Sequence, residues 1–272
     1  MLISRRTTLS LRSLALLYLT LMLLAPVGVV FYRTFEHGFG VAWAWITTPA
    51  AVSAFWLSVT LAAIAVPLNT IFGVTAALVI VRRRGRLASL LNSLIDLPFV
   101  ISPVIVGLAL TLVYGNSGWF GSWLNGHGIQ VIFAPAGMAL ATIFVSLPFV
   151  VREVAPVLVE VGDEQEQAAA TLGASSWQSF WRVTLPSIRW GVAYGVVLST
   201  ARALGEIGAV LVVSSNVAGS TLTLPLLVYQ RDSQLGSSTV TGAYAAASEL
   251  AVMSLIVLLA MTAFSPRRHE PR

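Results

Sequence analysis

Six long apolar stretches constrain the possible folds of this chain more than any other feature of its sequence. A helix needs about 20 residues to cross the roughly 30 Å hydrocarbon core of a bilayer. Stretches of about that length lie at residues 14–32, 54–80, 94–114, 132–151, 191–214 and 243–264. Backbone polar groups in lipid must be paired within the spanning segment, which favours helices. The sequence therefore predicts an all-α, polytopic membrane bundle of six transmembrane helices.

Composition supports a membrane protein. Hydrophobic residues make up 57% of the 272 residues and charged residues only 10%, whereas a soluble domain carries roughly 25% charged residues. The first stretch follows three arginines, as a secretory signal does, but no small-residue cleavage site follows it and further stretches do. We interpret it as an uncleaved first helix. We expect residues 1–272 to form a single transmembrane domain.

The placement of arginine predicts how the chain is oriented. All 16 basic residues are arginine. Arg33 and Arg231 fall on one side and Arg202 lies within the fifth stretch. The remaining arginines fall on the other side: Arg5, Arg6, Arg12, Arg82, Arg83, Arg84, Arg86, Arg152, Arg182, Arg189, Arg267, Arg268 and Arg272. Cytoplasmic loops are enriched in arginine and lysine, so both termini and a segment at about 152–190 are expected in the cytoplasm.

Aromatic residues agree with this orientation. Five tryptophans gather near the opposite face of the predicted bundle: Trp43, Trp45, Trp56, Trp119 and Trp123. Tryptophan is enriched at membrane–water interfaces because its ring is apolar and its N–H is polar. These residues therefore indicate an interfacial belt on the outer side.

Several kinds of chemistry are excluded by residue types that the chain lacks. It contains no cysteine, which rules out disulfides, thiolate metal sites and thiol catalysis. It also contains no lysine, so a Walker A phosphate loop and Schiff-base chemistry are impossible. His37, His127 and His269 are far apart and lack metal-ligand spacing. We therefore expect no catalytic residues, no metal site and no cofactor, and the chain offers no constellation for an intramembrane enzyme.

The segment between the fourth and fifth stretches is polar, although the rest of the chain is suited to lipid. It begins with acidic residues and alanines, and Gly173 is placed as the stop of a first short helix. Ser175 or Ser176 can cap a second short helix, which Pro186 is expected to end. The second helix carries Trp177, Phe180 and Trp181, and its two tryptophans share a face. Two interpretations remain open: a docking site for a cytoplasmic protein, or an amphipathic hairpin on the inner leaflet.

The spacing of this segment resembles the EAA loop of permease subunits of binding-protein-dependent ABC importers. The family pattern is Glu-Ala-Ala, three residues, Gly, nine residues, Ile-x-Leu-Pro. The matching positions are Gln167, Ala168, Ala169, Gly173, Val183, Leu185 and Pro186. Gln167 replaces the usual glutamate and Val183 the usual isoleucine. The resemblance implies that these residues dock the ATPase, with Glu166 as the candidate to replace the missing charge at position 167.

A wider resemblance covers most of the chain. The following runs resemble sulfate/thiosulfate permease subunits: Asp96-Leu-Pro-Phe, Ser102-Pro103 with Gly107, Pro148-Phe-Val-Val-Arg-Glu153 and Ala201-Arg-Ala-Leu-Gly-Glu-Ile-Gly-Ala209. Residues 205–214 are more similar to the W-type subunit than to the T-type. The resemblance implies a type I ABC importer permease (MetI-like) fold in a bacterial inner (plasma) membrane. Molybdate/tungstate permeases share much of the pattern and remain an alternative.

This resemblance also implies a set of partners. It implies a homologous T-type permease, two copies of a separate ATPase, an extracytoplasmic sulfate-binding protein and membrane lipid, and no nucleic acid. The chain itself would form half of a pore for sulfate or thiosulfate and hydrolyse nothing. A transporter powered by an ion gradient is a rival of another class, although such folds usually contain internal repeats, and none is visible here.

Charged residues also fall within the stretches or at their edges: Asp96, Arg202, Glu206 and Glu249. Each costs roughly 2.5–3.5 kcal/mol at a helix centre on insertion scales, so each needs a partner or a polar path. Arg202 precedes Glu206 by four residues, which is the weaker order for a pair on one helix, so we expect partners on neighbouring helices. Ala201, Gly205 and Ala209 form a stripe of small residues for close packing. Either the charges form a structural network, or Arg202, Glu206 and Asp96 lie along the path of a divalent oxyanion, which arginine suits.

Overall fold

The computed structural model describes residues 5–83, 85–234 and 236–264, and the secondary structure of these residues is helical, with no strands. Five residues named above lie outside the described residues: Arg84, Arg267, Arg268, His269 and Arg272. The all-α prediction is confirmed.

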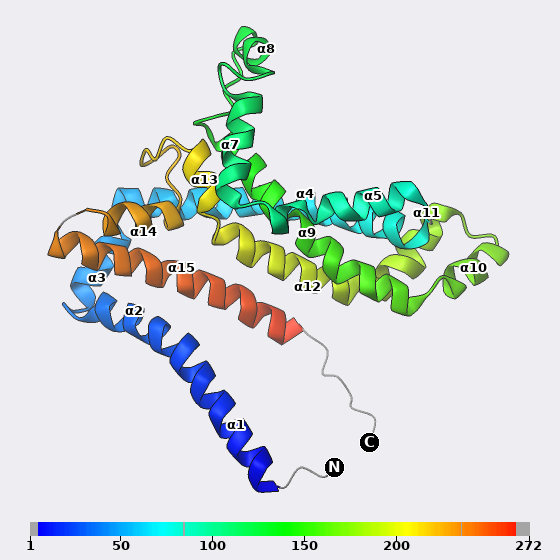
Figure 1. The fold of residues 1–272 in the computed structure, drawn as a ribbon, viewed down its shortest axis with the longest axis horizontal. Coiled ribbons are helices and arrows are strands. Elements are labelled where there is room, and N and C mark those ends of the chain that lie inside the picture. The colour runs from blue at the N-terminus through cyan, green and yellow to red at the C-terminus, as the bar shows by residue number, and fades with distance from the viewer. Residues whose placement is uncertain (1–4, 84, 235, 265–272) are drawn as a thin grey trace.

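The first half of the chain contains α1 (Arg5–Leu19), the π-helix η1 (Thr20–Leu24), α2 (Ala25–Phe35), α3 (Phe39–Ile46), α4 (Pro49–Arg82), α5 (Arg86–Ile95), α6 (Leu97–Val100), α7 (Pro103–Tyr114) and α8 (Gly121–Gly126). The second half contains α9 (Pro135–Val161), α10 (Glu164–Thr171), α11 (Ser176–Ser179), the π-helix η2 (Phe180–Thr184), α12 (Leu185–Leu204), α13 (Gly208–Val213), α14 (Leu224–Asp232) and α15 (Ser237–Phe264). The long helices α4, α9, α12 and α15 follow the long axis, whereas α1 diverges from them and α7 projects across it (Figure 1).

Within the residues that the structure describes, four helical segments are long and apolar enough to cross a membrane: Leu11–Phe35, Pro49–Arg82, Pro135–Val161 and Thr239–Ala260. The third predicted stretch is a bent pair, Arg86–Val100 and Pro103–Tyr114, which meet at 110°. It counts as a fifth span only if the pair is taken together. The fifth predicted stretch is divided, because α12 ends at Leu204 and α13 begins at Gly208. The six predicted transmembrane stretches therefore correspond to four continuous spans, one bent pair and one helix broken near Gly205 among the described residues.

The bend in the third stretch has a local cause. Proline disfavours the helical conformation for the residue before it, and Ser102 accordingly has a ψ of 135° before Pro103. The preceding Ile101 is also extended, with a ψ of 130°. Pro103 can nevertheless begin α7, because the first turn of a helix does not need that N–H.

The helices α4, α9 and α12 pack closely around Val150 of α9. A Cβ on Gly73 of α4 would lie 2.7 Å from the Val150 Cβ, and a Cβ on Gly195 of α12 would lie 2.8 Å from its Cα. Small residues at such positions allow two helix backbones to approach. Asn69 of α4 also donates hydrogen bonds to the Ile143 carbonyl (3.1 Å) and the Ser146 hydroxyl (2.9 Å) of α9. These contacts make the three helices one unit.

A second close contact joins the two broken helices. A Cβ on Gly107 of α7 would lie 2.6 Å from the Ala209 carbonyl oxygen, and one on Gly208 would lie 3.0 Å from the Pro103 Cβ. The expected stripe of small residues therefore does not run along one helix, because α12 ends before Gly205. Close packing depends instead on glycines at the start of α13 and on α7.

Candidate functional site

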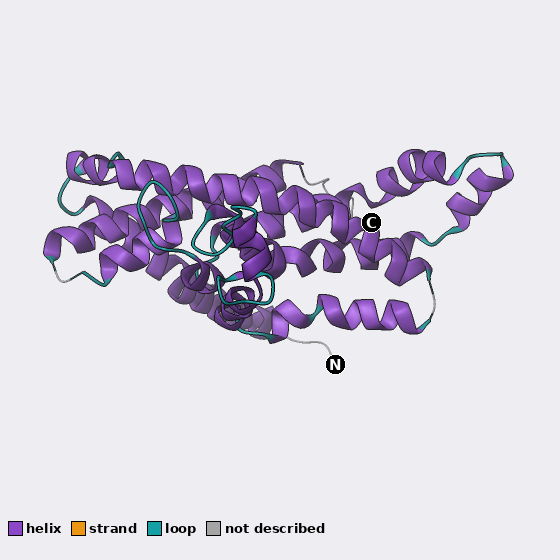
Figure 2. Cartoon of the chain, turned by 90° about the horizontal axis from the view of Figure 1, so that it is seen from above, coloured by secondary structure: helices purple, strands orange, loops and turns teal. Residues whose placement is uncertain are grey.

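The α10–α11 hairpin, residues 162–186, extends beyond the end of the bundle formed by α9 and α12 (Figures 1 and 2). Its corner is Gly173, which has a φ of +83°, a conformation that glycine adopts readily and other residues avoid. The Gly173 N–H donates to the Ala170 carbonyl at 3.0 Å and the Ala174 N–H to the Ala169 carbonyl at 3.0 Å. These bonds satisfy carbonyls at the end of α10. The prediction that Gly173 stops the first helix is confirmed.

The second helix begins with a capping box. The Ser175 hydroxyl accepts from the Gln178 N–H (3.3 Å), and the Gln178 side-chain oxygen accepts from the Ser175 N–H (2.9 Å). Two backbone donors of the first turn are thereby satisfied. Of the two serines proposed from the sequence, Ser175 is therefore the cap.

The prediction that Pro186 ends the second helix is wrong. The chain is helical from Ser176 to Leu204, through a π turn at residues 180–184. In this turn the Leu185 N–H donates to the Phe180 carbonyl, five residues back. Pro186 falls in the first turn of α12, and the wider π turn just before it changes the local hydrogen-bond register, which makes a proline tolerable. The hairpin therefore continues directly into α12.

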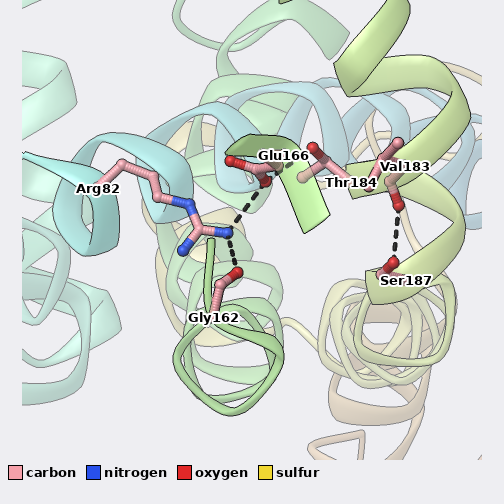
Figure 3. Close-up of polar contacts among 6 residues, drawn as sticks. All are labelled: Arg82, Gly162, Glu166, Val183, Thr184 and Ser187. Atoms are coloured by element: carbon pink, nitrogen blue, oxygen red, sulfur yellow. Dashed lines mark hydrogen bonds and ion pairs between the residues drawn. The ribbon is translucent and has the colours of Figure 1, made fainter. Parts of the chain in front are cut away.

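One ion pair ties the hairpin to the bundle (Figure 3). Arg82, the last residue of α4, donates from Nη2 to the Gly162 carbonyl (2.6 Å) and to Oε1 of Glu166 (3.0 Å). The Thr184 hydroxyl donates to the same glutamate oxygen at 2.8 Å. The Arg82 and Glu166 side chains are 23% and 26% exposed. We call these residues, Arg82, Gly162, Glu166 and Thr184, the latch.

The latch changes the interpretation of Glu166. From the sequence, its carboxylate was a candidate to replace the charge missing at Gln167, facing an ATPase. In the structure that carboxylate is instead bonded within the chain to Arg82 and Thr184. Sequence reasoning missed both partners: the only signal at Arg82 was its place in a run of arginines, and Thr184 carried none.

The rest of the matched motif is divided between surface and interior. Gln167, Ala168, Gly173 and Pro186 are exposed, whereas Ala169, Val183 and Leu185 are partly buried. The Val183 carbonyl accepts from the Ser187 hydroxyl at 2.7 Å (Figure 3). The motif therefore contributes to both the outer face of the hairpin and its attachment to the bundle.

The hairpin exposes several large apolar side chains among its polar ones. Leu172 is 88% exposed, Trp177 is 70% exposed and Trp181 is 49% exposed. The rings of the two tryptophans lie edge to face with centroids 5.5 Å apart, which confirms that they share a face. An apolar patch next to polar residues is typical of a surface that contacts another protein or a membrane.

The charges expected along a pathway form two separate pairs. Arg202 Nη1 lies 2.6 Å from Oε2 of Glu206, whose side chain is 1% exposed. The other oxygen of Glu206 accepts from the Ala209 N–H at 2.7 Å, so the carboxylate also caps the start of α13. The expectation of partners on neighbouring helices is therefore wrong for this pair, because the helix is broken beside it. Asp96 is bonded instead to the Arg152 guanidinium of α9.

Two further charges lie outside both of these pairs. Arg231, which the sequence places on the outer side, is only 6% exposed. It donates to the Gly242 carbonyl (2.9 Å) and the Thr48 hydroxyl (2.8 Å), and its guanidinium carbon lies 5.0 Å from the centre of the Trp45 ring. Glu249 of α15 borders an apolar cavity of about 480 Å³ between α2 and α15.

Comparison with known proteins gives the family. The family described as "Binding-protein-dependent transport system inner membrane component" matches residues 69–270. Among curated relatives, the sulfate transport system permease protein CysW of Synechocystis sp. is 51% identical over 245 residues, which cover 90% of this chain and 89% of the relative. CysW of Escherichia coli K12 is 44% identical over 87% of this chain and 80% of its own length. CysT of Synechococcus elongatus is 40% identical over 90% of this chain and 87% of its own length.

Solved structures agree on the fold. A bacterial ABC transporter that imports the acidic polysaccharide alginate aligns with a TM-score of 0.77 and 19% identity, over 98% of each chain. The MetNI methionine ABC transporter aligns with a TM-score of 0.59 and 16% identity, over 78% of this chain and 93% of that one. At such identities the likeness shows the fold alone, and it confirms the type I importer permease architecture.

The resemblance to W-type sulfate permease subunits is confirmed, since both of these CysW relatives are more similar to this chain than the CysT relative is. The matched family and the apolar helices make the chain a multi-pass membrane protein. The chain belongs to the family of binding-protein-dependent transport system inner membrane components.

Proposed function

We propose that this chain is the permease subunit of an ATP-driven importer of sulfate or thiosulfate. The observation that carries this proposal is the 51% identity, over 90% of the chain, with a sulfate transport permease. A relative of the T type that is 40% identical supports a second, homologous permease as its partner in the pore. The description of the family supports an external binding protein that delivers the anion.

We propose that a pair of separate ATPase subunits in the cytoplasm supplies the energy for transport. The arginine bias supports a cytoplasmic location for the α10–α11 hairpin, within the loop at about 152–190. There the exposed face of Leu172 and Trp177 would seat the ATPase, together with Gln167, Ala168 and Gly173. The hairpin is continuous with α9 at one end and α12 at the other, so a push on it reaches both helices. Residues 1–272 act in this proposal as one domain surrounded by lipid.

The translocation pathway is proposed to pass near the break between α12 and α13. Irregular backbone at membrane depth is tolerated where it is buried in protein or lines a water-filled cavity. Arg202 is 30% exposed there while its partner Glu206 is buried. A partly neutralised arginine can attract a divalent anion and still release it. Asp96, bonded to Arg152, would lie at the edge of this path.

Sulfate uptake tests the proposed function. Cells that lack this chain should lose uptake of radiolabelled sulfate, and the restored chain should return it. A hundredfold excess of molybdate should leave most of that uptake in place, because the proposed cargo is sulfate. Uptake should also stop when ATP is depleted while the proton gradient is kept. Uptake that molybdate abolishes, or that survives ATP depletion, would contradict the proposal.

A substitution at the hairpin corner gives a second test. Gly173→Val is expected to reduce uptake strongly, because a left-handed conformation costs a β-branched residue about 1–2 kcal/mol. No atom of this chain lies within 4 Å of the Cβ position, so within the chain the substitution acts on the backbone alone. Gly173→Asn should retain most activity, since asparagine tolerates positive φ.

The control for this substitution is Gly126→Val in α8, where the Cβ would also meet open space but φ is not positive. Sulfate uptake and ATPase activity should be measured in parallel for the three variants. Equal uptake by Gly173→Val and Gly126→Val would show that the shape of the corner does not matter.

A further inference from the structure

We propose that Arg82 is a positioning residue that clamps the hairpin to α4, so that movement of the hairpin reaches this helix as well as α9 and α12. The inference rests on the proposed function, because it concerns how ATP-driven movement enters the bundle. Arg82 lies outside the matched motif and at least 80 positions from the residues it bonds.

The latch joins four elements at one point. Arg82 ends α4, Gly162 follows α9, Glu166 lies in the first turns of α10, and Thr184 ends η2. Arg82 donates to both Gly162 and Glu166 through its Nη2 atom. Glu166 accepts from both Arg82 and Thr184 through its Oε1 atom. Figure 3 shows the guanidinium between the carbonyl of Gly162 and the carboxylate of Glu166. A shift of α10 therefore strains bonds to α4 and η2 together.

The surroundings of the latch distinguish it from an ordinary surface ion pair. Exposed pairs contribute little because water competes for both charges. Here the Arg82 Nε is buried and has no hydrogen-bond partner among the described residues. The guanidinium thus gives up part of its hydration to reach this position. It also lies at the C-terminal end of α9, where a positive charge interacts favourably with the helix dipole.

Little else holds α10 in place. None of its residues is buried, and the turns on both sides contain glycines with positive φ, Gly162 (+70°) and Gly173 (+83°). A Cβ at either glycine would meet no atom within 4 Å, so packing does not restrict these turns. Without the latch, α10 would be a short helix between two hinges. With the latch it becomes a rigid extension of α4, α9 and η2.

Coupling in a reconstituted transporter tests this inference. The complete importer, with its ATPase and binding protein, should be placed in liposomes, and sulfate transported per ATP hydrolysed should be measured. Arg82→Gln and Glu166→Gln should each lower that ratio about tenfold, within the range of coupling free energies between sites. The charge-swapped pair Arg82→Glu with Glu166→Arg should recover part of it. Arg83→Gln is the matched control, because Arg83 is adjacent and exposed.

A distance measurement covers the case in which a variant assembles poorly. The chain has no cysteine, so Thr75→Cys on α4 and Gln165→Cys on α10 provide the two spin-label sites of this chain, which is measured with ATPase and binding-protein subunits freed of reactive cysteines. The distance distribution should be narrow in the labelled parent and broad after Arg82→Gln. An unchanged ratio of transport to hydrolysis in Arg82→Gln, or an unchanged distribution, would overturn the latch. Failure of the unmodified transporter to use ATP would instead overturn the proposed function.

Discussion

Trp177→Asp should abolish sulfate uptake and release the ATPase subunits from the purified complex. Trp177 is 70% exposed, so the substitution costs the fold little. In the proposed interface, however, it removes an aromatic anchor and buries an unpaired charge. Loss of an interface hot spot costs at least about 2 kcal/mol, or roughly thirtyfold in affinity. Co-purification of the ATPase with the tagged permease measures the first effect and sulfate uptake the second.

The matched control is Trp119→Asp. Trp119 is 86% exposed and belongs to the turn between α7 and α8, and these two elements lie away from the hairpin (Figure 1). This variant should keep the ATPase in the complex. If both variants lost it equally, the loss would reflect general damage. If Trp177→Asp kept it, the hairpin face would not be the docking surface.

Glu206→Ala should have the largest effect on stability. The Glu206 side chain is 1% exposed, pairs with Arg202 and accepts the Ala209 N–H. Removing one partner of a buried ion pair typically destabilises a protein by about 3–5 kcal/mol, because the other charge is left without compensation. Loss of the cap on α13 adds to this. The midpoint of thermal denaturation in detergent should fall, and less protein should remain monodisperse after extraction.

Arg202→Gln separates structure from transport at the same place. Arg202 is 30% exposed, so its loss should destabilise the protein less than Glu206→Ala does. If Arg202 attracts the anion, this variant should assemble with normal yield and transport sulfate slowly. Normal assembly and normal transport by Arg202→Gln would contradict a role for Arg202 in the pathway. A Glu206→Ala chain as stable as the parent would contradict the structural role of Glu206.

The sequence predicts well those features that depend on neighbouring residues. Apolar stretches predict the helices because backbone pairing in lipid is local. The corner at Gly173 and the cap at Ser175 follow from rules that involve a few adjacent positions. Family membership follows from a motif whose spacing is preserved even though Gln167 departs from it.

The features that were missed or mispredicted depend on the conformation of adjoining segments or on tertiary contacts. Pro186 is a helix stop by local rules, yet a preceding π turn accommodates it. The order of Arg202 and Glu206 disfavours a pair only on a continuous helix, and this helix ends between them. The latch at Arg82 joins residues at least 80 positions apart. Charge placement predicts the side of the membrane on which an arginine lies, but not its partner.

Cross-linking from the hairpin tests the central claim most directly. A Leu172→Cys chain carries a single thiol, because the parent has none, and Leu172 is 88% exposed. In inside-out vesicles we predict that a short thiol-reactive photocross-linker joins this residue to the ATPase, while a membrane-impermeant reagent added outside intact cells does not reach it. Labelling from outside, or cross-links to lipid alone with no nucleotide-hydrolysing subunit attached, would contradict the account.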